Sequence, residues 1–256
     1  MINFRGVVLS AVVVALSACT TTGSLPSQPE KWKPDKRAQA HVDLGLDYLR
    51  RGQFKTAREE FDLAISIDPQ SANAYHGKGL LMAQSGYTED AKKLFSKAVG
   101  IDANNFLAVN DYGTYLCQNG EIQKGIDVLK RVESRADNRL ATNTQLGLGV
   151  CNFEQDDMAE AKKHFRAVLI VSPTLHQALQ PMAEISFQEQ NYLSARAFIE
   201  RFIASGVLSE KILVLGVNTE LELGDKEKAR QYAKELRRSY PTSSELEKFR
   251  SLLTNG

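Results

Sequence analysis

The chain has few cysteines, a single tryptophan and no excess of charge of either sign. Its 256 residues include three cysteines and seven prolines, and 32 basic residues are balanced by 31 acidic ones. This balance gives no basic surplus of the kind that binds nucleic acid. The chain also lacks CxxC, GxSxG and glycine-rich phosphate-loop motifs, and its histidines show no metal-binding spacing. We therefore predict neither an enzyme nor a metal or cofactor site; the four histidines are His41, His76, His164 and His176.

Long apolar runs are scarce as well, because only the stretch from Gly6 to Leu16 combines length with a complete lack of charge. It is too short to span a bilayer as a helix. A basic residue before it, Arg5, and small residues after it give the pattern of a secretory signal peptide. We expect residues 1–18 to be this peptide, which directs the chain out of the cytoplasm.

The end of this segment reads Leu16-Ser17-Ala18-Cys19, which resembles the signal of bacterial lipoproteins. The resemblance implies that Cys19 receives a lipid, including palmitate, and becomes the new N-terminus. The alternative is an ordinary signal peptide followed by a chance cysteine. Because Thr20, and not Asp, follows Cys19, the resemblance implies anchoring on the periplasmic face of the outer membrane.

Residues 19–37 have the composition of a flexible linker behind the lipidated cysteine. Three threonines, a glycine and prolines at positions 26, 29 and 34 disfavour regular structure. Trp32 lies within this segment, and the sequence does not indicate what it contacts.

From residue 38 to the end the chain is built from copies of one pattern with a period of 34 residues. Small and large residues recur in six copies that start near positions 38, 72, 106, 142, 176 and 210, with a slip of two residues before the fourth. This spacing is typical of tetratricopeptide (TPR) repeats. We predict an all-α fold, an α-solenoid of six helix-turn-helix TPR repeats over 38–256. A C-terminal capping helix is expected at about 244–253, with Leu246, Phe249, Leu252 and Leu253 facing the last repeat.

Glycines occupy two kinds of position in this pattern. One kind lies in the middle of each first helix, where glycine costs up to about 1 kcal/mol relative to alanine. We infer that a neighbouring helix must approach closely there, at Gly45, Gly79, Gly113 and Gly149. The other kind suits the end of the first helix, where a positive φ favours glycine; these are Gly52, Gly86, Gly120 and Gly224.

The first helices of such repeats line a concave groove through positions 2, 5, 9, 12 and 13 of each copy. An exposed apolar strip there would mark a protein-binding site. The alternative is that neighbouring helices cover part of the strip. The predicted protein-binding residues are Val42, Leu46, Leu49, Arg50, Leu80, Asn110, Leu146 and Phe153.

The third and fourth repeats carry a family resemblance. The run Asn110-Asp111-Tyr112-Gly113-Thr114-Tyr115-Leu116-Cys117, and the later Leu148-Gly149-Val150-Cys151, are similar to the type IV pilus biogenesis lipoproteins, the pilotins known as PilF or PilW. The resemblance implies a non-enzymatic assembly factor, and we expect the protein to be a monomer. It implies that secretin subunits are the partner, that the protein promotes their localisation and multimerisation in the outer membrane, and that it serves twitching motility.

Two other functions remain open at this point. One is a TPR lipoprotein adaptor of another envelope machine, acting in porin insertion or with peptidoglycan enzymes. The other is a non-catalytic subunit of an enzyme whose active site lies on a different chain.

Cys117 and Cys151 are the only thiols left once Cys19 is acylated. They fall on the first helices of repeats three and four, which we expect to pack side by side. Because an oxidising compartment permits disulfides, we predict a bond between them. The alternative is a pair of buried, reduced cysteines.

Overall fold

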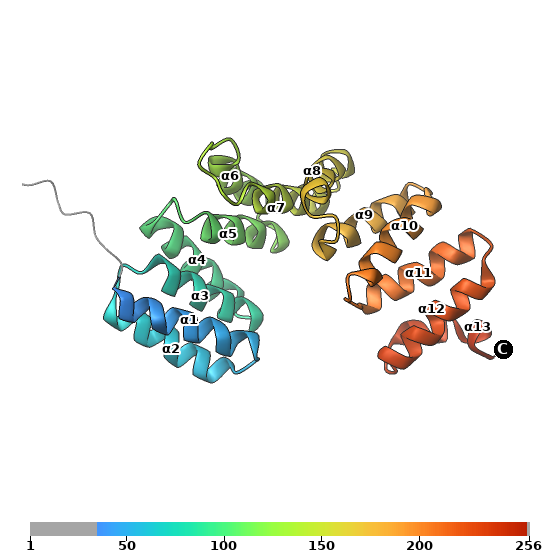
Figure 1. The fold of residues 1–256 in the computed structure, drawn as a ribbon, viewed down its shortest axis with the longest axis horizontal. Coiled ribbons are helices and arrows are strands. Elements are labelled where there is room, and N and C mark those ends of the chain that lie inside the picture. Colours follow the sequence, from blue (N-terminus) through green and yellow to red (C-terminus); the bar gives the residue numbers. More distant parts are fainter. Residues whose placement is uncertain (1–34, 255–256) are drawn as a thin grey trace, which may run out of the picture. The chain divides into compact units, whose positions relative to one another are not determined.

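Antiparallel helix pairs make up the fold in the computed structural model, which describes residues 35–254. Figure 1 shows the pairs following one another in chain order. Within the described range there are helices and connecting turns but no strand. The pairs are α1 (Lys36–Arg50) with α2 (Phe54–Ile67), α3 (Ala72–Gln84) with α4 (Thr88–Ile101), α5 (Phe106–Gln118) with α6 (Ile122–Glu133), α7 (Ala141–Glu154) with α8 (Met158–Val171), α9 (His176–Gln188) with α10 (Tyr192–Ala204), and α11 (Glu210–Glu222) with α12 (Lys226–Ser239).

This arrangement confirms the predicted fold class, an all-α solenoid of TPR repeats. Each helix pair is one repeat, and from the second repeat on each first helix also packs on the pair before it. The connection from α6 to α7, residues 134–140, is the longest between repeats. It contains the two-residue slip of the sequence pattern.

The mid-helix glycines lie against the paired helix, as predicted, and the atoms that come closest to them are those of aromatic or aliphatic side chains. A Cβ atom added to Gly45 would lie 2.6 Å from Cε1 of Phe61, and one added to Gly149 would lie 2.7 Å from Cε1 of Phe165. Both distances are well below van der Waals contact, so glycine is required for this packing. Phe61 and Phe165 are fully buried, which makes them the centres of their repeats.

The predicted turn glycines adopt the positive φ that ends each first helix. The values are 71° at Gly52, 79° at Gly86, 82° at Gly120 and 78° at Gly224. Repeats four and five have Asp156 and Gln190 at this place, with φ of 63° and 58°. The geometry of the turn is therefore kept where the glycine is not.

The first repeat differs from the others on the side that would face a preceding repeat. The third position of the pattern is fully buried in repeats two to six, at Ala74, Ala108, Thr144, Ala178 and Ile212. In repeat one this position is Ala40, which is exposed. Asp43 and Asp47 lie on the same side of α1 and remain accessible to water. A polar outer face of this kind suits the end of a repeat array.

The C-terminal end is covered by a segment that differs from the single capping helix we predicted over 244–253. It consists of a 3-10 turn η1 (Ser244–Glu247) and a short helix α13 (Arg250–Thr254). The break between them lets Phe249 turn inward, where only 4% of its surface is exposed. Phe249 packs with Leu213, Val217 and Leu236 of the last repeat.

The predicted signal peptide, Cys19 and residues 20–34 of the predicted linker lie outside the described residues. The end of that linker was assigned wrongly, because Lys36 and Arg37 already belong to α1. Between residues 35 and 254, none of the helices is long and apolar enough to cross a membrane.

Candidate protein-binding surface

The structure corrects two of the predicted groove residues in the first repeat. Val42 and Leu49 expose only 1% and 5% of their surface. They belong to the core that α1 shares with α2 and α3, in contact with residues such as Phe61 and Leu81. Because α3 packs along α1, these two side chains fill the space between repeats and do not line a groove.

Asn110 is also wrong as a surface residue, since it is 2% exposed. The hydroxyl of Thr144 donates to its Oδ1 at 2.8 Å, and Nδ2 of Asn138 donates to Thr144 Oγ1 at 2.9 Å. Asn110 Nδ2 has no hydrogen-bond partner among the described residues. The three side chains form a buried polar link between α5, α7 and the connection that precedes α7.

The remaining predicted residues do reach the surface. Arg50 is exposed and forms an ion pair with Asp47 at 3.2 Å. Leu46 and Leu80 are half-buried against the core of the first two repeats.

Leu146 and Phe153 are half-buried on α7, together with Val150. These three residues, spaced i, i+4 and i+7, follow one face of the helix. We call them the α7 row. All three pack on the core of repeats four and five while keeping part of each side chain exposed. Neighbouring helices thus cover part of the predicted apolar strip. The three residues of the α7 row are the part of the strip that stays partly exposed on this helix.

A ladder of amide side chains crosses the first three repeats, and sequence reasoning missed most of it. Asn73 Nδ2 donates to Gln39 Oε1 at 2.9 Å, and Asn105 Nδ2 donates to Asn73 Oδ1 at 2.7 Å. Gln39 and Asn73 occupy the same place in consecutive copies, which was the available signal. The ladder gives this part of the surface a polar border.

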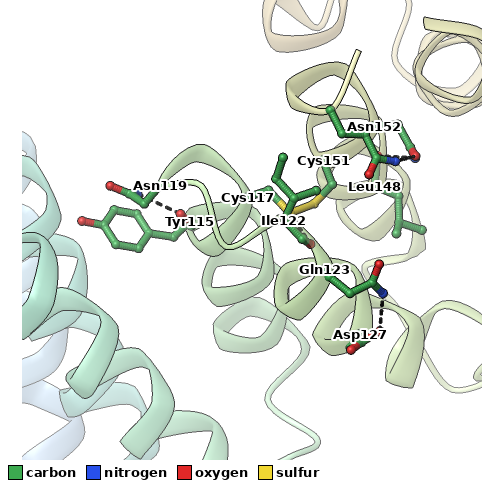
Figure 2. Close-up of a disulfide and its surroundings, with 10 residues drawn as sticks. Tyr115, Cys117, Asn119, Ile122, Gln123, Asp127, Leu148, Cys151 and Asn152 are labelled. Atoms are coloured by element: carbon green, nitrogen blue, oxygen red, sulfur yellow. Dashed lines mark hydrogen bonds between the residues drawn. A yellow bond between two sulfur atoms is a disulfide. The ribbon is translucent and has the colours of Figure 1, made fainter. Parts of the chain in front are cut away.

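Cys117 and Cys151 form a disulfide in the structure, between α5 and α7 (Figure 2). The Cα atoms lie 5.0 Å apart, within the range that a disulfide requires. Both residues are buried. Gly125 on α6 makes room for the bond, because a Cβ atom there would collide with Cys117 Sγ.

The titratable groups form ion pairs and small networks of alternating charge, such as Lys92 and Lys124 with Glu121. His41 Nδ1 lies 2.7 Å from Glu60 Oε2, and His76 Nε2 lies 2.7 Å from Asp111 Oδ2. No group of three or more His, Cys, Asp or Glu residues within 35–254 is placed to hold a metal ion. The features at the surface are those of protein contact: apolar side chains with polar borders.

Comparison with known families identifies the repeats. A TPR repeat model matches residues 45–86, and tetratricopeptide repeat models match residues 72–105, 144–174 and 216–243. The helix pairs, their period and these matches define a tetratricopeptide-repeat protein.

The similarity to one relative extends over nearly the whole chain. The type IV pilus assembly protein PilF of Pseudomonas aeruginosa is 26% identical over 250 residues, covering 96% of this chain and 98% of PilF. The solved structure of P. aeruginosa PilF superposes with a TM-score of 0.72 at 25% identity, over 85% of this chain and 98% of that one. PilW, described as a widely conserved type IV pilus biogenesis factor, shares the fold with a TM-score of 0.74 at 19% identity, over 84% and 98% of the two chains. The chain is homologous to PilF over nearly its whole length, and it shares the fold of PilF and PilW.

Proposed function

We propose that this protein is a pilotin-like assembly factor of the type IV pilus, which promotes outer-membrane localisation and multimerisation of the secretin. The observation that carries the proposal is the near full-length homology with PilF, a type IV pilus assembly protein. A match over nearly the whole of both chains supports a shared role more strongly than a shared repeat alone would. TPR solenoids bind other proteins through their extended surfaces, which suits a role in assembly.

The α7 row is the contact we propose for a secretin segment. Its three apolar side chains are partly exposed without a polar partner, so an amphipathic helix or an extended strand would remove more of their surface from water. Leu46 and Leu80 are two further half-buried apolar side chains, and they pack on the core of the first two repeats.

A substitution in the α7 row tests this contact. We expect Val150→Glu to abolish capture of the secretin from solubilised outer membranes, because burying an unpaired carboxylate opposes binding. Leu193→Glu is the matched control, since Leu193 is an exposed leucine on α10. Circular dichroism must show equal helicity in both variants. Equal capture of the secretin by folded Val150→Glu protein would reject the α7 row as the contact.

We further propose that Cys19 carries the lipid that holds the protein at the outer membrane. Cys19→Ala should leave the TPR domain folded and release the protein from the outer-membrane fraction. Secretin subunits should then fail to multimerise or collect in the inner membrane. Unchanged fractionation of the variant would contradict the lipid anchor without bearing on the α7 row.

A further inference from the structure

Five of the six repeats carry a basic residue at the same position of the second helix. Its side chain contacts the following repeat or, in the last repeat, the C-terminal cap. These residues are Arg58, Lys92, Lys162, Arg196 and Arg230. Arg58 Nη2 contacts Met82 Sδ at 3.9 Å, Lys92 Nζ contacts Glu121 Oε1 at 2.7 Å, Lys162 Nζ contacts Glu189 Oε2 at 2.7 Å, Arg196 Nε contacts Glu220 Oε1 at 2.9 Å, and Arg230 Nε contacts the carbonyl oxygen of Leu252 at 3.1 Å. In each of these five repeats, a cation on the second helix therefore joins the repeat to the next repeat or to the C-terminal cap.

The third repeat breaks this series. Ile126 stands 34 residues after Lys92, at the place of the basic residue. It is 7% exposed and packs with Cys117, Leu148 and Cys151. The joint between repeats three and four is thus held by the disulfide, while no cation from this place in α6 crosses it.

A cleft of about 420 Å³ lies at this joint, between α6 on one side and α7 and α8 on the other. A cleft of this volume can hold a small ligand or a side chain of another protein. Ile126 and Leu148 supply apolar surface, and Figure 2 shows Leu148 and Asn152 on α7 beside the disulfide. The other lining residues are polar: Gln123, Lys130, Glu133, Asn152, Gln155, Glu160, Lys163 and His164.

His164 presents a hydrogen-bond acceptor to this cleft. Its Nδ1 lies 2.6 Å from Gln145 Oε1, and the Nε2 of Gln145 lies 3.4 Å from Glu133 Oε1. The carboxylate fixes the orientation of the amide, so Nδ1 of His164 carries the proton and Nε2 is a bare acceptor. Burial lowers the pKa of His164, which keeps the ring neutral near pH 7.

A carboxylate stands beside this acceptor. Glu160 Oε2 lies 3.9 Å from His164 Nε2, too far for a hydrogen bond between them. Glu160 also pairs with the exposed Lys163 at 2.9 Å. An incoming cation would compete with Lys163 for Glu160, whereas His164 Nε2 is open to any donor that fits between them.

We propose that this cleft binds an arginine side chain from a partner protein, which supplies in trans the cation that the third repeat lacks. The methylene stem of the arginine would lie on Ile126 and Leu148, as long basic side chains do on apolar surface. Its planar group offers five N–H donors in a fixed arrangement, which suits two acceptors side by side better than the compact ammonium of lysine does. This site lies on α6, α7 and α8, but it shares no residue with the α7 row and does not depend on the pilus role.

Titration of the full chain in detergent with N-acetyl-arginine amide, followed by NMR, tests the proposal. We expect the probe to shift the imidazole signals of His164 and the methyl signals of Ile126. N-acetyl-lysine amide should bind more weakly, and N-acetyl-norleucine amide should leave these signals unchanged. Equal shifts with the norleucine probe, or none with the arginine probe, would overturn the proposal.

Two substitutions of opposite sign sharpen the test. Glu160→Gln should weaken binding roughly three- to tenfold, as expected for loss of a charge-assisted hydrogen bond at a partly exposed site. Lys163→Gln should strengthen binding, because it frees the carboxylate of Glu160. Glu189→Gln is the control, since Lys162 already occupies that acceptor. If Glu160→Gln and Lys163→Gln change binding in the same direction, the assigned acceptor is wrong.

The missing cation can also be restored within the chain. Ile126→Arg should fill the cleft and prevent binding of the arginine probe, and persistent binding would overturn the proposal. If this variant loses helicity, His164→Phe replaces it in the test, and we expect His164→Phe to weaken binding of the arginine probe because it removes the Nε2 acceptor. Repeat five has Phe198 at the position of His164, so the ring is compatible with the repeat. Undiminished binding by folded His164→Phe protein would reject the site.

Discussion

Gln190 occupies the same turn position in the fifth repeat that Gly224 occupies in the sixth, and both residues have a positive φ. The angles are 58° at Gln190 and 78° at Gly224. A left-handed conformation costs a residue with a side chain roughly 1–2 kcal/mol, and glycine avoids this cost. The fifth repeat therefore keeps the turn at the expense of local strain.

Exchanging the two residue types should change stability in opposite directions. Gln190→Gly should stabilise the protein by roughly 0.5 kcal/mol, because the relieved strain exceeds the entropy that glycine adds to the unfolded chain. Gly224→Gln should destabilise it by a similar or larger amount. Urea unfolding of the two variants measures both changes, and a loss of stability in Gln190→Gly would contradict the strain at this turn.

The disulfide should be present in the protein and should contribute to its stability. The bond closes a loop with a sequence separation of 34 residues, for which the chain-entropy model gives about 3 to 4 kcal/mol. Thiol titration of denatured, unreduced protein should find neither Cys117 nor Cys151 free. Urea unfolding with and without reductant then measures the stabilisation. Two titratable thiols would mean that the cysteines are buried but reduced.

Leu49 and Leu46 should respond differently to truncation. Leu49 is 5% exposed within the core of the first two repeats, so Leu49→Ala should cost about 2–4 kcal/mol of unfolding free energy. Leu46 is half-buried, and Leu46→Ala should cost roughly 1 kcal/mol. Thermal or urea unfolding distinguishes the two. Similar losses would show that α1 is more mobile against α3 than the packing indicates.

Glu121 should stay ionised in acid well below the usual range of a glutamate. Hydrogen bonds from Lys124 and Lys92 lower its pKa from 4.5 to about 2. Because the folded state favours the ionised form of Glu121 more than the unfolded chain does, its ion pairs with Lys124 and Lys92 stabilise the fold above about pH 4.5. That contribution is lost as the pH falls from about 4.5 through about 2.

NMR titration of the Glu121 carboxyl carbon checks this value. In Lys124→Gln the pKa of Glu121 should rise toward 4.5, since the largest cause of the shift has been removed. A pKa near 4.5 in the unaltered protein would mean that the ion pair does not persist in solution.

The sequence was sufficient for the fold because the repeat pattern reflects steric needs that recur in every copy. Gly45 and Gly149 predicted that a neighbouring helix lies close to them. In the structure Phe61 makes this contact at Gly45 and Phe165 makes it at Gly149. The same reasoning failed for the groove. Position 5 of the pattern is Val42 in one copy, Asn110 in another and Leu146 in a third, and only Leu146 reaches the surface.

The reason is that exposure depends on how closely neighbouring first helices pack, which varies from joint to joint. The disulfide and the Asn110–Thr144 hydrogen bond draw α5 and α7 together. A repeat template read from one copy at a time contains no information on such differences. The cleft beside Ile126 could not be predicted for a related reason. It lies where the third repeat has an isoleucine in place of the basic residue that the other repeats carry.

The polar outer side of α1 limits how the array can be extended. A further repeat stacked on α1 in the manner of the others would have to bury the carboxylates of Asp43 and Asp47. At the opposite end it would have to displace Phe249 from its contacts with α11 and α12. Lengthening this scaffold by recombination is therefore feasible only at internal joints, where a whole helix pair is inserted between two apolar faces.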